Sequence, residues 1–332
     1  MNIHFRHTPA NKSLYPFSQI RDVQDIRVGI LTIREKWNLI SQKLNITFLE
    51  VDNNIVPSLE YAHSLIRNTE PDSSHYRVIQ FPWDIFSHND WAIRNDFELL
   101  THDRRSSVIS STNRIIDPVN VFLEKGVKME FCTINASMGP VYLGKNAVIM
   151  EGASIRGPFA IGENSVIKMG TRIYGATSAG PNCIMGGEIK NTVLFGNSNK
   201  AHDGYLGDSV IGEWCNLGAG TSNSNLKNTA GDVRVWNNAN NDFDIVGNKC
   251  GLIMGDYSRS AINTSFNTGT VVGVSCNVFG SEYPKKWVPD FSWGEEKYIL
   301  EKAITDIGNW KKLKNADISA EEIEVLTKLY NK

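Results

Sequence analysis

His202 is the residue of this chain around which chemistry is most readily built. It is the only one of the seven histidines beyond residue 102, and it lies where a regular pattern of the sequence is interrupted, between Val193 and Tyr205. Loops that leave a regular scaffold often carry catalytic side chains. An imidazole can accept and return a proton near neutral pH, which suits it to deprotonate an amine or hydroxyl that attacks a thioester carbonyl. We therefore predict that His202 is a general base; the alternative is a hydrogen-bonded structural or surface histidine.

The pattern that His202 interrupts is a six-residue repeat. An aliphatic residue returns at every sixth position over residues 143–173, and the same phase is recovered over 205–217 and, more weakly, over 254–278. An amphipathic helix would repeat at three and four residues, whereas short strands joined by tight corners fit a period of six. This rhythm predicts a parallel β-helix, in which each six-residue segment forms one wall. A β-sandwich of short strands would produce the same phase only by accident.

Glycine divides the chain into two parts. Gly29 is the only one of 27 glycines before residue 126, which places a boundary near residue 115 in a chain of 332 residues. A chain of this length fits one to three domains. We predict an N-terminal domain over residues 1–115, the β-helix over 116–282 and a C-terminal helical tail over 283–332. In the β-helix, glycine is expected at corners because left-handed backbone conformations cost little there.

Composition excludes several classes of protein. With 41% apolar and 21% charged residues and a formal charge of −2, the chain can bury a core and resembles neither a disordered nor a nucleic-acid-binding protein. No apolar run approaches 18 residues, and the start lacks the apolar stretch of a signal peptide. Five cysteines without a C-x-x-C pair suggest neither disulfides nor a zinc knuckle. The repeat region has only one histidine, His202, which cannot supply the three ligands of a γ-carbonic-anhydrase-like zinc site. We expect a cytoplasmic protein without a membrane span or a bound metal.

Two segments around the histidine resemble a known family. Residues 200–212, KAHDGYLGDSVIG, and 215–221, CNLGAGT, resemble the motifs K-x-x-H-x-x-Y-L-G-D and N-I-G-A-G-T of the left-handed β-helix acyltransferases, most closely the acetyltransferase half of GlmU. GlmU is a bifunctional glucosamine-1-phosphate acetyltransferase and N-acetylglucosamine-1-phosphate uridyltransferase. Residues 25–37, DIRVGILTIREKW, extend the resemblance to a GlmU-related group of sugar nucleotidyltransferases over nearly the full length. The resemblance implies a left-handed β-helix that transfers an acyl group.

The resemblance also implies roles for residues around the histidine. Glu188 falls where the family orients its histidine through a carboxylate, and the backbone N–H of Ala219 falls at the oxyanion donor. Arg172 and Lys190 fall where the family places cations for the sugar phosphate, and Arg156 is a rival for the arginine role. The remaining positions implied for the acceptor are Tyr205, Asn216 and Asn225. For each residue, the alternative is a solvated side chain on a face of the β-helix.

Acetyl-CoA is the acyl donor that the resemblance implies, as a co-substrate. Lys227 is assigned to its binding together with the N–H of Ala219, and Lys249 and Arg259 are further cations that could pair with CoA phosphates. Surface cations are more often simply solvated. The family habit is a homotrimer in which a groove between β-helices combines residues of two chains. The polar segment 222–228 is therefore expected to form a loop over the site that reaches a neighbouring subunit.

The N-terminal pattern predicts a small α/β unit. Its expected elements are helices over 25–41, 58–67 and part of 84–100, and strands over 46–51 and 76–81. A working nucleotidyltransferase needs a Gly-rich loop that approaches the triphosphate, as in the L-A-A-G-x-G-T-R-M motif of GlmU. The unit has only Gly29, inside the first predicted helix. We therefore predict a truncated, degenerate nucleotidyltransferase-like domain with a binding or structural role.

The C-terminal tail carries two helix-start signals. The sequences SWGE at residues 292–295 and SAEE at 319–322 match capping boxes, which predict helices near 293–313 and 319–331. Such helices would cover the open end of the β-helix.

The sequence leaves three functions open. The first is acyl transfer from acetyl-CoA to an amino or hydroxyl group of a sugar phosphate or nucleotide-linked sugar. The second is nucleotidyl transfer to a sugar 1-phosphate by the N-terminal domain, in which Arg21, Arg27 and Arg34 are either phosphate ligands or a solvated helix face. The third is a trimeric scaffold that binds a nucleotide-sugar without turning it over. The missing Gly-rich loop and the site around His202 favour acyl transfer.

Overall fold

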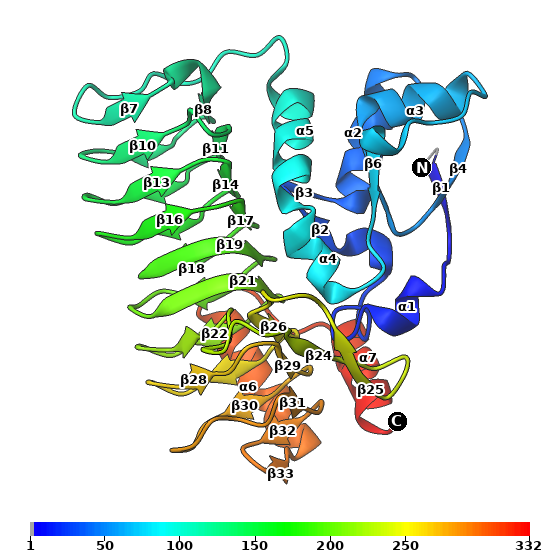
Figure 1. The fold of residues 1–332 in the computed structure, drawn as a ribbon, viewed down its shortest axis with the longest axis vertical. Coiled ribbons are helices and arrows are strands. Elements are labelled where there is room, and N and C mark those ends of the chain that lie inside the picture. Colours follow the sequence, from blue (N-terminus) through cyan, green and yellow to red (C-terminus); the bar gives the residue numbers. More distant parts are fainter. Residues whose placement is uncertain (1–2) are drawn as a thin grey trace.

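A parallel β-helix forms the body of the molecule, as the six-residue repeat predicts. The computed structural model describes residues 3–332 and shows a left-handed β-helix with an N-terminal α/β region at its side and two C-terminal helices (Figure 1). Each coil of the β-helix runs through three faces, which we call A, B and C in the order of the chain. The predicted fold class is confirmed.

Face A carries the first strand of each coil. Its strands pair in parallel and in register, so equivalent residues stack from coil to coil. The first and third residues of its three-residue strands are exposed or half-buried, so face A is open to solvent. The strands are β7 (Arg114–Ile116), β10 (Thr133–Asn135), β13 (Ser154–Arg156), β16 (Arg172–Tyr174), the first halves of β19 (Glu188–Leu194) and β21 (Tyr205–Ile211), and then β23 (Ser222–Asn223) and β28 (Ser265–Phe266).

Face B is buried on both sides. Every residue of its three-residue strands is buried, because the lumen covers one side and the N-terminal region the other. The strands are β8 (Val121–Leu123), β11 (Val141–Leu143), β14 (Phe159–Ile161), β17 (Thr177–Ala179), the second halves of β19 and β21, β26 (Leu252–Met254), β29 (Thr270–Val272) and β31 (Trp287–Val288).

Face C consists of two-residue strands whose second residue points into the lumen, except in the last parallel strand, where Trp293 is exposed and pairs with the outward Asn277. The strands are β9 (Lys128–Met129), β12 (Val148–Ile149), β15 (Val166–Ile167), β18 (Ile184–Met185), β20 (Asn199–Lys200), β22 (Asn216–Leu217), β27 (Arg259–Ser260), β30 (Asn277–Val278) and β32 (Ser292–Trp293), with β33 (Glu296–Lys297) added antiparallel at the end. Aliphatic side chains from all three faces fill the lumen. At the corner between faces C and A, Gly152 and Gly170 have φ values of +74° and +66°, which explains glycine there.

The N-terminal region consists of short elements in three two-stranded sheets. Strand β1 pairs with β4 in parallel, whereas β2 with β3 and β5 with β6 are antiparallel. The elements are β1 (Ile3–Arg6), α1 (Ala10–Ser13), β2 (Arg27–Val28), β3 (Leu31–Thr32), α2 (Ile33–Lys43), β4 (Leu49–Asp52), β5 (Ile55–Pro57), α3 (Leu59–Ile66), β6 (Tyr76–Val78), α4 (Pro82–Ser87) and α5 (Asn89–Thr101). Helix α3 and the pair α4 and α5 confirm the helices predicted over 58–67 and 84–100.

The helix predicted over residues 25–41 is wrong in its first part. The chain first forms the β2–β3 hairpin, which holds Gly29 at a φ of +83°, and α2 begins only at Ile33. A capping box explains this start: the Thr32 hydroxyl accepts from the Glu35 N–H, and the Glu35 carboxylate accepts from the Thr32 N–H. Both hairpin and helix turn apolar side chains inward, so the periodic positions Ile26, Ile30, Ile33, Trp37 and Ile40 are all buried.

The N-terminal region covers face B along most of its length. Figure 1 shows α5 beside β8, β11, β14 and β17, and α4 lies against β19 and β21. The outward side chains of face B are mostly apolar, as expected for a parallel sheet covered on both sides. Asn89 of α5 fixes the position of the hairpin, since its Oδ1 accepts from the Gly29 N–H at 2.8 Å while its Nδ2 donates to the Ala176 carbonyl at 2.7 Å.

The three N-terminal arginines serve neither of the roles proposed from the sequence. The Arg21 guanidinium is buried and pairs with Asp256 of the β-helix at 2.5 Å. The Arg34 guanidinium pairs with Asp25 at 2.5 Å, and Arg27 donates to the backbone carbonyl of Ile30. All three are held by partners of the chain, so they form neither a solvated helix face nor a free phosphate site.

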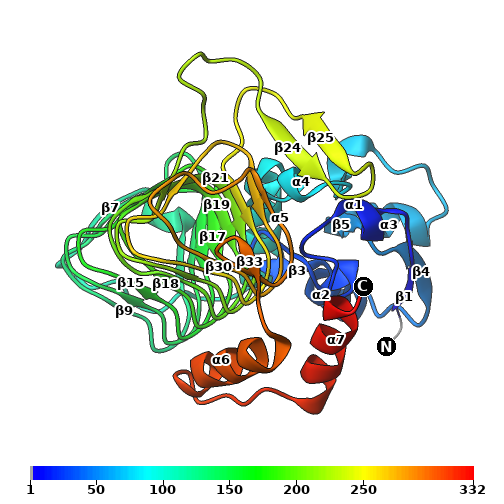
Figure 2. The ribbon, with the colours of Figure 1, turned by 90° about the horizontal axis from the view of Figure 1, so that it is seen from below.

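Residues 224–251 leave the β-helix at the corner between faces A and B. They form a loop and the hairpin of β24 (Arg234–Asn237) and β25 (Asp242–Ile245), which Figure 2 shows near α4. Trp236 stacks on Trp287 at a centroid distance of 4.3 Å, and Val233 and Val235 pack in the core shared with the N-terminal region. The polar segment 222–228 therefore begins as β23 and ends at the base of this insertion.

The C-terminal tail contains the two predicted helices, α6 (Leu300–Lys312) and α7 (Ala320–Tyr330). The capping box of Ser319 and Glu322 is confirmed. The one expected at 292–295 is wrong: Ser292 begins strand β32, and Gly294, at a φ of +60°, turns the chain into β33, so α6 starts seven residues later than predicted. Figure 2 shows both helices to one side of the β-helix and not over its end, so the expectation that they cover the open end is wrong. Among residues 3–332, no helix is long and apolar enough to cross a bilayer.

Candidate functional site

His202 lies at the corner between faces C and A. It follows β20 in the loop 201–204, is exposed, and lines an open depression of about 560 Å³. Ala219 lines the same depression from the next coil, and Gly187 does so from the preceding one. The structure therefore brings the predicted base and the predicted oxyanion donor to one surface hollow.

The backbone N–H of Ala219 is free. It donates a hydrogen bond to no residue in the described range 3–332, although the Ala219 carbonyl accepts from the Asn263 N–H at 2.7 Å. The neighbouring Gly220 N–H donates to the Asp203 carbonyl at 3.1 Å and so ties this corner to the His202 loop. A fixed, unpaired N–H is what an oxyanion donor requires.

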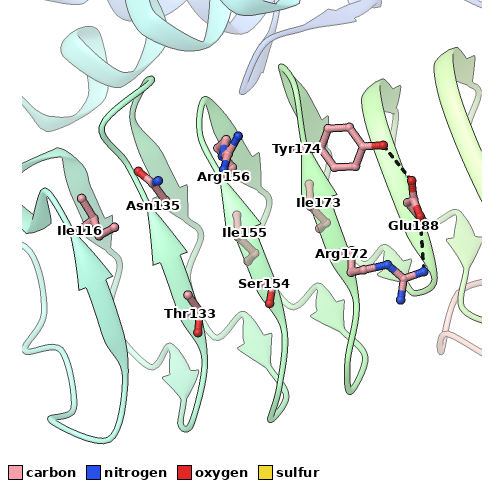
Figure 3. Close-up of a pocket in the computed structure, with 10 residues that line it drawn as sticks. All are labelled: Ile116, Thr133, Asn135, Ser154, Ile155, Arg156, Arg172, Ile173, Tyr174 and Glu188. Carbon is pink, nitrogen blue, oxygen red and sulfur yellow. Dashed lines mark hydrogen bonds and ion pairs between the residues drawn. The ribbon is translucent and has the colours of Figure 1, made fainter.

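Glu188 begins β19 on face A, directly beside the His202 loop. Its N–H donates to the Gly204 carbonyl at 3.2 Å. Its carboxylate, however, accepts from the Tyr174 hydroxyl at 2.7 Å and pairs with Arg172 at 3.4 Å (Figure 3). The hydrogen bond to Glu188 raises the pKa of Tyr174. Glu188 makes no hydrogen bond to His202 in this structure, so its orienting role stays a prediction.

Lys190 and Tyr205 also lie on face A. Lys190 stacks next to Tyr174 in the register of β16 and β19, and its ammonium has no ion-pair or hydrogen-bond partner in residues 3–332. The Tyr205 ring folds over Gly207, where a Cβ would lie 2.2 Å from the Tyr205 hydroxyl. Burial raises the pKa of Tyr205. Gly207 is therefore the residue that lets this tyrosine lie flat on the face.

Asp208 contacts one of the predicted acceptor residues and was not itself predicted from the sequence. Its buried carboxylate accepts from the Asn191 side chain at 2.7 Å and from the side chain of Asn225, one of the predicted acceptor ligands. Both Asn191 and Asp208 have φ values of +46° at the corner between faces A and B. The only signal in the sequence was the spacing of 17 residues from Asn191 to Asp208 and again to Asn225, which is one coil.

Asn216 lies apart from the other predicted acceptor residues. It is the outward residue of β22 on face C, whereas Arg172, Lys190 and Tyr205 are on face A. The corner that carries His202 separates the two sets. A single chain therefore does not gather all the predicted acceptor ligands on one surface.

A second depression extends the row of polar side chains on face A. It has a volume of about 510 Å³, and Figure 3 shows Arg156 and Asn135 in it next to the pair of Tyr174 and Glu188. Arg156 is exposed and has no partner within residues 3–332, in contrast to Arg172. The structure thus leaves Arg156 as a rival for phosphate binding.

The cations assigned to CoA lie away from His202. Lys227 donates to the backbone carbonyl of Asp232 inside the insertion, and Lys249 lies at its base, bridged to Leu226. Arg259 is buried on face C, with its guanidinium 5.1 Å from the ring centroid of Trp310 in α6. None of the three lines the His202 depression.

Comparisons with known proteins match both parts of the chain. A family model described as "Sugar nucleotidyl transferase" matches residues 5–52 and 53–105. The bifunctional protein GlmU of Methanococcus vannielii is 26% identical over 252 residues, which is 70% of this chain. The chain is thus similar to GlmU proteins. The GlmU protein of Methanocaldococcus jannaschii is 38% identical over 89 residues, 27% of this chain.

The similarity to these relatives is partial. The matched segments span 52% and 21% of the two GlmU proteins' own lengths. Among solved structures, the UDP-N-acetylglucosamine acyltransferase from Campylobacter jejuni aligns with 67% of this chain and 95% of its own, with 12% identity and a TM-score of 0.36. The lysine of the loop departs from the GlmU motif, since Lys200 precedes His202 by two residues and not three.

Proposed function

We propose that the chain is an acyltransferase that moves an acetyl group from acetyl-CoA to a sugar phosphate or a nucleotide-linked amino sugar, with His202 as general base. The observation that carries the proposal is that His202 and Ala219, whose backbone N–H is free, line one open depression. The similarity to GlmU proteins supports a transferase. Five buried, unpaired cysteines fit the cytoplasm, where thiols stay reduced.

The residues of the corner suit a thioester donor. Exposed Met169 and Ile262 line the depression on either side of His202 and offer apolar surface to an extended arm. His202 removes the proton of the attacking amine or hydroxyl, and the Ala219 N–H stabilises the charge on the carbonyl oxygen. Lys190, Arg172 and the rival Arg156 supply positive charge for the acceptor's phosphate.

We further propose that the site is completed in a homotrimer. Asn216 on face C cannot share a ligand with Lys190 on face A of the same chain, whereas a neighbouring copy can bring its face C to this face A. Closed symmetric assembly repeats such an interface around a ring. We also propose that residues 1–115, 116–282 and 283–332 are the three domains of the chain. In this arrangement the N-terminal domain has a structural role, because it covers face B.

Subunit complementation tests this arrangement. Lys190→Met and Asn216→Ala are each expected to lose most transfer activity, but coexpression of the two variants should restore about a quarter of it, because a quarter of randomly mixed interfaces combine an intact face A with an intact face C. The measurement is thiol release from acetyl-CoA by the purified mixture. If the variants co-assemble but the mixture has no transfer activity, Lys190 and Asn216 of different chains do not form one site, and the proposed arrangement is wrong.

Nucleotidyl transfer is the second candidate, supported by the family model that matches residues 5–105. The hairpin at Gly29 argues against it. The N–H groups of Gly29, Ile30 and Leu31 donate to the side chains of Asn89 and Asp96, so they offer no cradle to a triphosphate.

One screen with two readouts separates the candidates. The chain is incubated with acetyl-CoA and a panel of amino-sugar phosphates and nucleotide-linked amino sugars, and with UTP or dTTP and sugar 1-phosphates. We expect thiol release with at least one acceptor and no pyrophosphate release. Robust pyrophosphate release would establish the nucleotidyl transfer that we discount. If neither thiol nor pyrophosphate is released, and acetyl-CoA does not shift the melting temperature, the remaining candidate is a scaffold that binds a nucleotide-sugar.

A further inference from the structure

Lys200 is a buried cation inside the lumen of the β-helix. It is the second residue of β20, where face C turns its side chains inward, and it is fully buried. In the preceding coil the equivalent residue is Met185, which pairs with Lys200 in the register of β18 and β20. In the next coil it is Leu217. An ammonium group thus occupies a position that neighbouring coils fill with apolar side chains.

The ammonium of Lys200 is satisfied by the loop that carries His202. Its Nζ donates to the backbone carbonyl of His202 at 2.5 Å and to that of Asp203 at 3.0 Å. Burial lowers the pKa of Lys200 to about 8, against an opposing effect of the Asp203 carboxylate. Hydrogen bonds from a charged donor are stronger than those between neutral groups. Two charge-assisted bonds therefore hold consecutive peptide groups of this loop from inside.

In other coils, the corner between faces C and A is stabilised without a lysine. The residue before the face A strand is an inward threonine in several coils, and its hydroxyl binds a corner carbonyl: Thr171 donates to Lys168 at 2.7 Å and Thr264 to Ala261 at 2.8 Å. In the His202 coil this position is Gly204, at a φ of +118°, where a Cβ would lie 2.0 Å from the Thr221 carbonyl. The inward hydroxyl is missing there, and Lys200 binds the corner carbonyls in its place.

We propose that Lys200 is the positioning residue of the His202 loop, which it anchors from the lumen so that the imidazole keeps its place opposite the Ala219 N–H. The assignment rests on the proposed acyl transfer for its catalytic consequence, but the anchoring itself does not. Burying an ammonium group costs free energy, whereas burying an apolar side chain does not. Lys200 therefore positions the loop at the expense of the stability of the fold.

Lys200→Met tests the proposal, because methionine already fills the equivalent position at Met185. We expect the variant to melt at the same or a higher temperature than the parent, while kcat for thiol release from acetyl-CoA, with the acceptor found in the screen, falls by about 10- to 100-fold. The N–H of Gly220, which donates to the Asp203 carbonyl, should exchange hydrogen faster. Met185→Leu, which changes the lumen without touching the loop, should keep both kcat and exchange at the parent's level.

The outcomes separate this inference from the proposed function. Unchanged kcat together with unchanged exchange at the Gly220 N–H would overturn the proposal, as would an equal loss of kcat in Met185→Leu. If Lys200→Met does not fold, Lys200→Gln replaces it with the same two readouts. If His202→Ala keeps full transfer activity, the general base is wrong, yet faster exchange in Lys200→Met would still establish the anchor.

Discussion

Replacing His202 by alanine is expected to lower kcat for acetyl transfer by about 10²- to 10⁴-fold, the usual contribution of a positioned general base. The Ala219 N–H and the cations of face A remain in the variant, so binding of both substrates should persist. Because His202 is exposed and its ring makes no hydrogen bond within residues 3–332, the midpoint of thermal unfolding should not move. Thiol release from acetyl-CoA measures the rate, and calorimetry the midpoint.

A second histidine provides the matched control. His102 is also exposed, and its contacts are to Glu98 and Asp103 at the end of α5, away from face A and its corners. His102→Ala should transfer acetyl groups at the parent's rate. Full activity in His202→Ala, or an equal loss in both variants, would remove His202 from the mechanism.

Replacing Lys36 by methionine is expected to destabilise the chain by about 3–5 kcal/mol, because it leaves a buried carboxylate without its counter-charge. Lys36 and Asp96 form an ion pair, and their side chains are 0% and 2% exposed. Asp96 also accepts from the N–H groups of Ile30 and Leu31 and so holds the β2–β3 hairpin. Burial lowers the pKa of Lys36 and raises that of Asp96, so each charge depends on the other.

Denaturant unfolding measures this loss, with Lys43→Met as control. Lys43 lies at the end of the same helix and is exposed, so its replacement should change the free energy of unfolding by no more than about 0.5 kcal/mol. A loss below about 1 kcal/mol in Lys36→Met would mean that the pair contributes no more than an exposed one.

The walls of the β-helix were predictable from the sequence because their signal is repeated. Residues such as Ile149 and Ile167 recur in the lumen coil after coil, and a period of six is typical of a parallel β-helix. The start of α2 was misplaced because the apolar residues of the hairpin happen to follow the same spacing as those of the helix. The capping box of Thr32 and Glu35 was the local signal that could have placed it.

The site was predictable only in part. The interruption of the repeat at His202 identified the loop, but not which predicted ligands share a face with it. Coils differ in length, since 18 residues separate Ile167 from Met185 but only 15 separate Met185 from Lys200, so counting along the chain does not give the face. The resemblance implied acceptor roles for both Asn216 and Lys190 without placing them on a face, and the unequal coils hid the position of Lys200 in the lumen.

The N-terminal region reaches its final packing only after residues far along the chain have been synthesised. The Tyr15 hydroxyl donates to the Asp290 carboxylate at 3.0 Å, and these residues are 275 positions apart in the sequence. Arg21 likewise pairs with Asp256, which is synthesised much later. At a ribosomal speed of about 5–20 residues per second, the partner of Tyr15 emerges roughly 15 to 55 s after it. During that interval the nascent N-terminal region lacks the sheet that buries its apolar side. The N-terminal region, although it is made before the β-helix, is thus among the last parts of this sequence to reach its final packing.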